Sequence, residues 1–261
     1  MNIYIAVDME GITGICSRDF TSKGNPYYNE GRKLLMHDVN AAIEGALAGG
    51  ASRILAADVH GGSYNFIFDE IHPKAEVLWG APGKNPRFPF LDESIDAMFL
   101  LGYHAMAGTK HAVLEHTMSS KDWFAASVNG IPVGEVAIDA AIAGVSGVPV
   151  TLVSGDDKVC AEASALLPGV ATATVKLGLG RHRALCYPKE RTGKIIFDAA
   201  REAVGKAKTV KPFTFKSPVE VAITYKHTEN ADSADGVHKD GYTVVTTYEK
   251  YEDWWGGLWK K

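Results

Sequence analysis

The chain begins with a strand, a helix and a second strand, and this order strongly limits the possible folds. Residues 2–7 (NIYIAV) are apolar and β-branched, as buried strands are, and residues 52–57 (SRILAA) have a similar pattern. Between them, apolar residues recur at helical spacing from residue 30 until Gly49 and Gly50 end the helix. A helix between two buried strands is typical of a parallel crossover connection. We therefore expect an α/β fold, with a mostly parallel central sheet flanked by helices.

Further strand and helix patterns follow and indicate a division into two parts. We predict strands over 75–79, 95–101, 112–118, 123–128, 148–153 and 170–175, and helices over 132–143, 157–167 and 189–208. The stretch 208–218 is rich in Lys and Pro and is the best candidate for a linker. Two strand-like segments, 219–225 and 242–248, come after it. We expect residues 1–187 to form the α/β domain and residues 188–261 a smaller C-terminal α+β part.

The composition excludes several classes of protein. With 46% hydrophobic and 22% charged residues, the chain is typical of globular proteins, and its net charge of −4 argues against nucleic-acid binding. Its three Cys are far apart and form no CxxC motif, so any metal would be held by His and carboxylates. The N-terminus has no basic signal-peptide region, and the longest apolar stretch is interrupted by Asp139. We expect a cytoplasmic protein that does not associate with membranes.

Three of the predicted strands end in residues that commonly bind metals. Asp8 and Glu10 follow the first strand, and side chains two residues apart on an extended segment point the same way. Asp58 and His60 follow the second strand, and His104 follows the strand over 95–101. The carboxyl ends of parallel strands line one crevice, where ligands bind. The sequence therefore predicts that Asp8, Glu10, His60 and His104 cluster in this crevice. Asp58 fits a capping or bracing role better.

Two further residues could complete such a site, and each has a competing interpretation. Glu135 lies in the first turn of a predicted helix. The helix dipole alone could explain a negative charge there, and the alternative is a carboxylate that points into the crevice. His116 could move a proton or stabilise charge beside the metals, and His111 is the alternative. We favour His116 because it lies on the segment 112–118, predicted as a strand. This set of carboxylates and imidazoles suits two zinc ions, which together can hold a bridging water and polarise a carbonyl.

Five short motifs around these residues occur in order along the chain: Val7-Asp8-Met9-Glu10-Gly11, Asp58-Val59-His60, Leu101-Gly102-Tyr103-His104-Ala105, His116-Thr117-Met118 and Pro132-Val133-Gly134-Glu135. In this order the chain resembles the zinc-dependent D-aminopeptidases of bacterial dipeptide-transport operons. The resemblance implies two Zn²⁺ ions per subunit, although other divalent ions could replace them. Asp8 would bridge both ions, Glu10 and His60 would complete one site, and a second pair, His104 and Glu135, would complete the other. His116 matches the proposed catalytic histidine of that family.

The resemblance also implies an activity and an assembly. Members of this family remove N-terminal residues from short peptides, and peptides that contain D-amino acids such as D-Ala are typical substrates. Hydrolysis would proceed through a water that bridges the metals. The family forms a ring-shaped homodecamer with its active sites inside a chamber, so we expect self-association into a homodecamer.

The C-terminal end departs from the family pattern and leaves alternatives open. It contains Trp254, Trp255 and Trp259, whose simplest explanation is packing at a subunit interface, with a lid over a neighbouring active site as the alternative. The activity could instead be that of an L-specific aminopeptidase of the same family, or of a dinuclear metallohydrolase acting on another amide or ester bond. A nucleotide-binding protein is a third possibility, but the chain lacks both the GxGxxG and the P-loop patterns.

Overall fold

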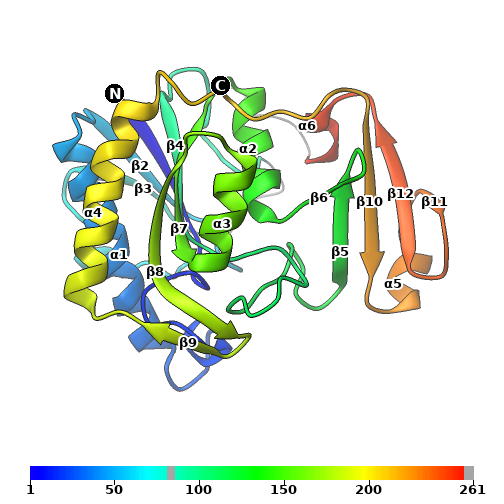
Figure 1. The fold of residues 1–261 in the computed structure, drawn as a ribbon, viewed down its shortest axis with the longest axis horizontal. Helices are drawn as coiled ribbons and strands as arrows, with labels where there is room; N and C mark the ends of the chain where they lie inside the picture. Colours follow the sequence, from blue (N-terminus) through cyan, green and yellow to red (C-terminus); the bar gives the residue numbers. More distant parts are fainter. Residues whose placement is uncertain (81–85, 256–261) are drawn as a thin grey trace.

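The computed structural model describes residues 1–80 and 86–255 and contains two sheets (Figure 1). The larger sheet has seven strands in the order β3-β2-β1-β4-β7-β8-β9. All neighbouring strands in it are parallel except β8 and β9. Its strands are β1 (Asn2–Val7), β2 (Arg53–Asp58), β3 (Ala75–Leu78), β4 (Ala97–Tyr103), β7 (Val150–Asp156), β8 (Ala171–Gly180) and β9 (Arg183–Cys186). The predicted α/β class with a mostly parallel sheet is confirmed.

Helices cover both faces of this sheet. They are α1 (Tyr28–Ala48), α2 (Glu135–Val145), α3 (Asp157–Leu166) and α4 (Lys189–Lys206). Ile3, Ile5 and Val7 of β1 belong to the same apolar core as residues of α1 and α4. Tyr4 and Ala6 face the opposite way, into a core that contains residues of α2 and α3. Successive side chains of a strand alternate between faces, so a strand covered on both faces must be continuously apolar.

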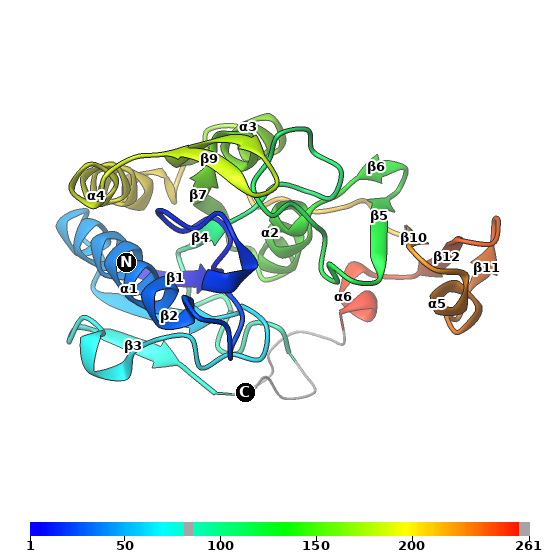
Figure 2. The same ribbon diagram turned by 90° about the horizontal axis from the view of Figure 1, so that it is seen from below.

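A smaller antiparallel sheet lies to one side of the larger one in both views (Figures 1 and 2). Its strand order is β11-β12-β10-β5-β6. The strands are β5 (Trp123–Val128), β6 (Ile131–Pro132), β10 (Val219–Tyr225), β11 (Val237–His238) and β12 (Thr243–Tyr248). The short helices are η1 (Arg18–Phe20), η2 (Phe68–Glu70), α5 (Thr228–Asp232) and α6 (Tyr251–Trp254).

The domain boundary predicted between residues 187 and 188 stays a prediction. Helix α4, which begins just after this position, packs against α1 and β8 of the larger body. Strand β5 comes from the middle of the chain and pairs with β10. The smaller sheet therefore combines strands from before and after the predicted boundary.

The strand predicted over 112–118 is wrong, because this segment forms a loop. His111, Leu114 and Met118 have φ values of 63°, 52° and 57°, in the left-handed region, which lies far from the φ of a regular strand and is rare for residues other than glycine. Residues 112–114 are nevertheless buried. The apolar pattern that predicted a strand therefore belongs to a buried loop.

Two of the C-terminal tryptophans pack within the chain. Trp254 and Trp255 are partly buried against the core on the α2 side of the sheet. Tyr251 begins α6 and donates a hydrogen bond to the carbonyl of Ile138 in α2 at 3.0 Å. Trp259 lies outside the described residues. In the parts of the chain that the structure describes, no helix has the length and apolar character needed to cross a membrane.

Candidate metal and active site

Two glycines allow the ends of β1 and β4 to approach each other closely. The N–H of Gly11 donates to the carbonyl of Gly102 at 2.7 Å, and a Cβ on Gly11 would lie 1.9 Å from the carbonyl oxygen of Tyr103. Gly102 has a φ of +73°, and a Cβ there would lie 2.4 Å from the carbonyl oxygen of Asp8. This contact brings Glu10, next to Gly11, to the end of β4.

The first group of possible ligands consists of Asp8, Glu10 and His60, whose donor atoms all lie within 4.8 Å of one another. His60 Nδ1 lies 2.9 Å from Asp8 Oδ1 and 3.1 Å from Glu10 Oε2. His60 Nε2 lies 2.9 Å from the carbonyl oxygen of Thr21. A carbonyl oxygen can only accept a hydrogen bond, so Nε2 donates to it. Nδ1 is therefore the nitrogen that faces the carboxylates.

The second group consists of His104, His116 and Glu135, which meet the same distance criterion. Glu135 Oε1 lies 3.3 Å from His104 Nε2 and 3.6 Å from His116 Nε2. The Nδ1 atoms of the two histidines contact the carbonyl oxygens of Ala105, at 3.1 Å, and Leu114, at 2.9 Å. All three histidines of the site thus use one nitrogen to bond the backbone and turn the other inward, as metal-ligating histidines do.

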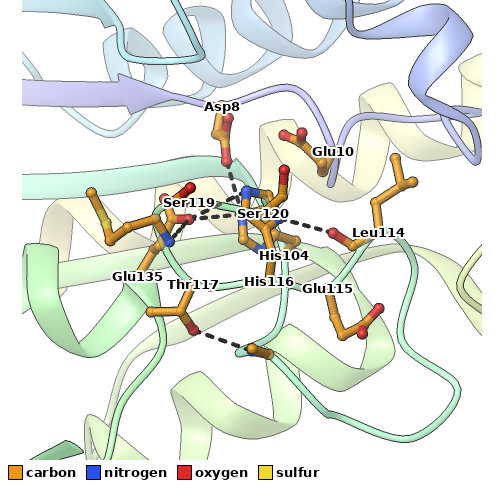
Figure 3. Close-up of polar contacts among 12 residues, drawn as sticks. Asp8, Glu10, His104, Leu114, Glu115, His116, Thr117, Ser119, Ser120 and Glu135 are labelled. Atoms are coloured by element: carbon orange, nitrogen blue, oxygen red, sulfur yellow. Dashed lines mark hydrogen bonds and ion pairs between the residues drawn. The ribbon is translucent and has the colours of Figure 1, made fainter. Parts of the chain in front are cut away.

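Asp8 connects the two groups. Its Oδ1 faces His60 at 2.9 Å, whereas its Oδ2 faces His104 at 3.4 Å. Figure 3 shows Asp8, His104, His116 and Glu135 pointing toward one another. Asp8 is therefore a carboxylate that faces both groups.

The buried polar atoms of this cluster fit a metal ion. Asp8, Glu10 and Glu135 are each no more than 7% exposed, so three carboxylates lie together out of water. Such burial is costly unless a cation or hydrogen bonds compensate for it. Glu10 Oε2 and His104 Nε2 are fully buried and make no hydrogen bond of good geometry with any described residue. Divalent ions bound by these carboxylates and imidazoles would satisfy both atoms.

The electrostatics of the cluster favour a negatively charged Glu135 beside a positively charged His104. Burial opposes ionisation of Glu135, but the neighbouring His104 lowers the pKa of this carboxyl to about 2. Burial likewise disfavours a charged His104, yet Glu135 and Asp8 raise the pKa of its imidazole to about 10. Burial and the charge of Glu10 raise the pKa of Asp8 to about 6. His116 differs from His104, because burial and the adjacent charge of His104 lower its pKa. The carboxylates thus hold positive charge at the centre of the site.

The loop that carries His116 is held from two sides. Met118 N donates to Glu135 Oε1 at 2.8 Å, which ties the loop to α2. Arg181, from the turn between β8 and β9, forms an ion pair with Glu115 and donates to its carbonyl oxygen. The ring of His116 stacks on that of His104, with centroids 3.9 Å apart and planes 13° apart. These contacts fix His116 without a strand.

The structure brings together all six predicted site residues, namely Asp8, Glu10, His60, His104, His116 and Glu135. His111 is exposed and does not line the cavity over the two groups. Asp58 accepts hydrogen bonds from the backbone and side chain of Asn65, at 2.7 and 2.8 Å, which is a bracing role. The roles of the six residues as metal ligands and as catalytic residue remain predictions.

A cavity of about 360 Å³ opens over the two groups. Its lining includes the exposed side chains of Arg18 and Lys121. Neither has an ion-pair partner among residues 1–80 and 86–255. The cavity therefore combines an acidic, imidazole-rich floor with two free positive charges.

A buried ion pair lies behind Glu135 and was not predicted from the sequence. Arg87 binds Asp139 through two hydrogen bonds of 2.6 and 2.9 Å, and its guanidinium also lies 3.6 Å from Glu135 Oε2. Tyr103 donates to Asp139 at 2.7 Å. Asp139, the one charged residue of α2 after Glu135, was the available signal, because a buried charge requires a partner.

A buried lysine behind Glu10 was also missed. Lys176 of β8 is fully buried, and its ammonium donates to three backbone carbonyls, those of Glu10 at 2.7 Å, Ile12 at 2.8 Å and Ile15 at 2.6 Å. An ammonium group has three donors, so all of them are used. Lys176 therefore fixes the backbone of the loop that begins with Glu10.

Three comparisons with known proteins each found a match. The family model described as M55 peptidase, D-aminopeptidase, matches residues 1–258, which include all six predicted site residues. A curated D-aminopeptidase of Bacillus subtilis (strain 168) is 31% identical over 237 residues, which are 90% of this chain and 85% of that protein. The chain also superposes on a solved structure with a TM-score of 0.91 and 30% identity, covering 96% of this chain and 93% of the other. That structure is described as the Zn-dependent D-aminopeptidase DppA from Bacillus subtilis, a self-compartmentalizing protease.

Proposed function

This chain belongs to the M55 peptidase family of D-aminopeptidases, and on that premise we propose that it is a zinc aminopeptidase that removes N-terminal D-amino acids, such as D-Ala, from short peptides. The observation that carries the proposal is the pair of buried ligand groups joined by Asp8. In both groups the histidines turn one nitrogen toward carboxylates and anchor the other on a backbone carbonyl. This arrangement is typical of metal sites.

We propose two zinc ions per subunit. Asp8 would bind both ions, Glu10 and His60 would hold the first, and His104 and Glu135 would hold the second. Carboxylate oxygens and imidazole nitrogens are ordinary zinc ligands, although they also accept other divalent ions. When bound, the ions supply a Lewis acid for the scissile carbonyl and lower the pKa of water beside them.

His116 is the proposed catalytic residue. Its Nδ1 contacts the carbonyl oxygen of Leu114 at 2.9 Å, so Nε2 is the atom free to exchange a proton with the substrate. Nε2 faces Glu135 at 3.6 Å, and the imidazole lines the cavity over both ligand groups. From this position His116 can pass a proton to the leaving amine or stabilise negative charge on the carbonyl oxygen.

Short peptides are the proposed substrates. The cavity of about 360 Å³ is small, and the positive charges of Arg18 and Lys121 at its lining complement the free carboxylate of a short peptide. We further propose that the chain assembles into a homodecamer, in line with the relative described as self-compartmentalizing. Its proposed location is the cytoplasm, in line with three cysteines that form no disulfide framework.

The test is a metal analysis combined with a substrate panel. We expect two equivalents of zinc per chain, and cleavage of D-Ala-D-Ala and of D-Ala p-nitroanilide faster than of their L-counterparts. The carboxamide of D-Ala-D-Ala should be a poorer substrate than the free dipeptide. A preference for the L-peptides would identify an L-specific aminopeptidase. Failure on every peptide, with hydrolysis of other amides or esters, would indicate the alternative metallohydrolase.

A further inference from the structure

We propose that Cys16 and Cys186 form a reversible disulfide site, which a low-molecular-weight disulfide can oxidise and which locks the loop after β1 to strand β9. This site lies outside the proposed metal centre and goes beyond the proposed function. Residues 11–17, called here the β1 loop, follow directly after Glu10. The thiols come from distant parts of the sequence, 170 residues apart, so only the fold brings them together.

The two sulfur atoms are already close. Cys16 Sγ and Cys186 Sγ lie 3.5 Å apart, compared with about 2.05 Å in a disulfide. Cys186 pairs with Lys176 across the antiparallel β8–β9 ladder, and directly paired residues project to the same face. Lys176 also binds the carbonyl of Ile15, the residue before Cys16. The same contacts that hold the β1 loop therefore place its thiol beside that of Cys186.

The two cysteines also differ in ways that suit an attacking and a resolving thiol. Cys186 is exposed, and the hydrogen bond from Cys16, together with the positive charge of Lys176, lowers its pKa to about 6. Cys16 is half-buried, and the same hydrogen bond together with burial raises its pKa. Reactive cysteines combine exposure with a stabilised thiolate and often have a second cysteine nearby.

Cys160 provides an internal contrast. It is 5% exposed, and burial raises the pKa of its thiol to about 11. Buried thiols of this kind are inert. The chain thus contains one reactive pair and one protected thiol, so the extent of oxidation can be measured by counting free thiols.

The reaction balances with oxidised glutathione as the two-electron oxidant. The Cys186 thiolate attacks one sulfur of glutathione disulfide, whose S–S bond breaks and releases one glutathione thiolate. The Cys16 thiol then loses its proton and attacks the Cys186 sulfur, which expels the second glutathione thiolate. One S–S bond forms in the protein, one breaks in the oxidant, and the two cysteine protons end on two reduced glutathione molecules.

The expected consequence is a more stable β1 loop. A covalent link between residues so far apart restricts the unfolded chain strongly, while the native sulfur positions need only a small adjustment. The midpoint of thermal unfolding should therefore rise by several degrees on oxidation and return after reduction. Neither this readout nor the thiol count depends on peptidase activity.

The test uses the reduced, zinc-loaded full chain treated with oxidised glutathione. After denaturation and alkylation, we expect one free thiol, that of Cys160, and a cross-linked peptide containing Cys16 and Cys186. Dithiothreitol should restore three free thiols. The matched control Cys160→Ala should form the same link, whereas Cys16→Ser should stop at a glutathione adduct on Cys186.

Cys186→Ser keeps the test decisive if Cys16→Ser folds poorly, because position 186 is exposed. This variant should form no intrachain link and show no oxidation-dependent rise in the unfolding midpoint. A wild-type chain that retains a glutathione adduct on Cys186 without the link would overturn the proposal. So would links that join two chains, which non-reducing electrophoresis detects.

Discussion

The two ligand groups are built from different kinds of structure. In the first group, Asp8, Glu10 and His60 follow β1 and β2, which are adjacent parallel strands with Val7 paired to Asp58. In the second group, His104 directly follows β4, Glu135 begins α2 and His116 lies on an irregular loop. The pairing of β1 with β2 thus brings the first group together, with Glu10 in a turn that Lys176 holds, whereas the second group combines a strand end, a helix and a loop.

The supporting charges differ in the same way. Behind the first group, Lys176 binds only backbone carbonyls, and so fixes the path of the chain. Behind the second group, Arg87 forms an ion pair with Asp139 and also reaches Glu135, a proposed ligand. We therefore expect the second group to be the more sensitive to substitutions outside the site.

The largest expected effect comes from removing a proposed ligand of the first group. His60→Ala should lose zinc and lower kcat by a factor of about 10³ or more, since metal catalysis supplies several kcal/mol. Metal analysis and steady-state kinetics measure both effects. His238→Ala, at an exposed position on β11, is the matched control and should retain both zinc and activity. Full activity of His60→Ala would remove this histidine from the proposed site.

Within the second group, His116→Ala separates a catalytic role from a ligand role. We expect zinc content close to that of the wild type and a kcat about 10²- to 10⁴-fold lower, the usual range for loss of an acid–base group. KM should change little. Loss of one zinc equivalent instead would make His116 a ligand.

For the second group, we expect Arg87→Met to lower the free energy of unfolding, although Arg87 is not itself a proposed ligand. Removing Arg87 leaves the buried Asp139 without a cationic partner, which should cost about 3–5 kcal/mol in the free energy of unfolding. Arg53→Met is the matched control, because it breaks an ion pair with Glu76 that is exposed on both sides and should cost about 0–1 kcal/mol. Urea denaturation measures both values. Equal costs would contradict the supporting role of the Arg87 pair.

A smaller effect, on the pH dependence of stability, is expected at Glu162. This carboxylate accepts a hydrogen bond from the N–H of Met106, and Met106 lies two residues after His104. Burial raises its pKa from 4.5 to about 7, and its Oε1 has no hydrogen-bond partner among the described residues. A raised carboxyl pKa means that the folded protein binds this proton more tightly than the unfolded chain does. Its contribution to stability is therefore fully present below pH 4.5 and is lost as the pH rises through 7.

Glu162→Gln should remove this pH dependence. At pH 8 the variant should be more stable than the wild type by about 1–3 kcal/mol, and the difference should vanish at low pH. Urea denaturation across this pH range provides the measurement. A wild-type stability that stays level between pH 5 and pH 8 would argue against the raised pKa.

The sequence could predict the first group better than the second, for a physical reason. Apolar runs end at Val7 and close to Asp58, so the sequence locates the ends of β1 and β2, which Asp8 and His60 follow. Glu10 also joins this group, although it lies in a turn and not on the extended segment expected from the sequence. For the second group, left-handed residues turn the predicted strand 112–118 into a loop, and no periodicity signals them. The choice of His116 over His111 rests on a strand that does not exist, but it is correct in placement, because His116 lines the cavity and His111 does not.

The buried charges were visible but could not be paired from the sequence. Asp139 and Lys176 both stand out in apolar segments, and each charge requires a partner. The partners are Arg87, 52 residues from Asp139, and backbone carbonyls more than 160 residues from Lys176. Likewise, nothing local indicates that β5 pairs with β10 in the smaller sheet. Long-range pairing depends on the whole fold and leaves no local pattern.

The most direct test of the account is the zinc stoichiometry of the Asp8→Ala variant beside the wild type. Asp8 faces both groups, at 2.9 Å from His60 and 3.4 Å from His104. The account predicts two equivalents of zinc per wild-type chain and the weakening of both sites in Asp8→Ala, after dialysis against a mild chelator. A wild-type chain that binds one equivalent, or an Asp8→Ala chain that keeps two, would contradict a metal centre shared through Asp8.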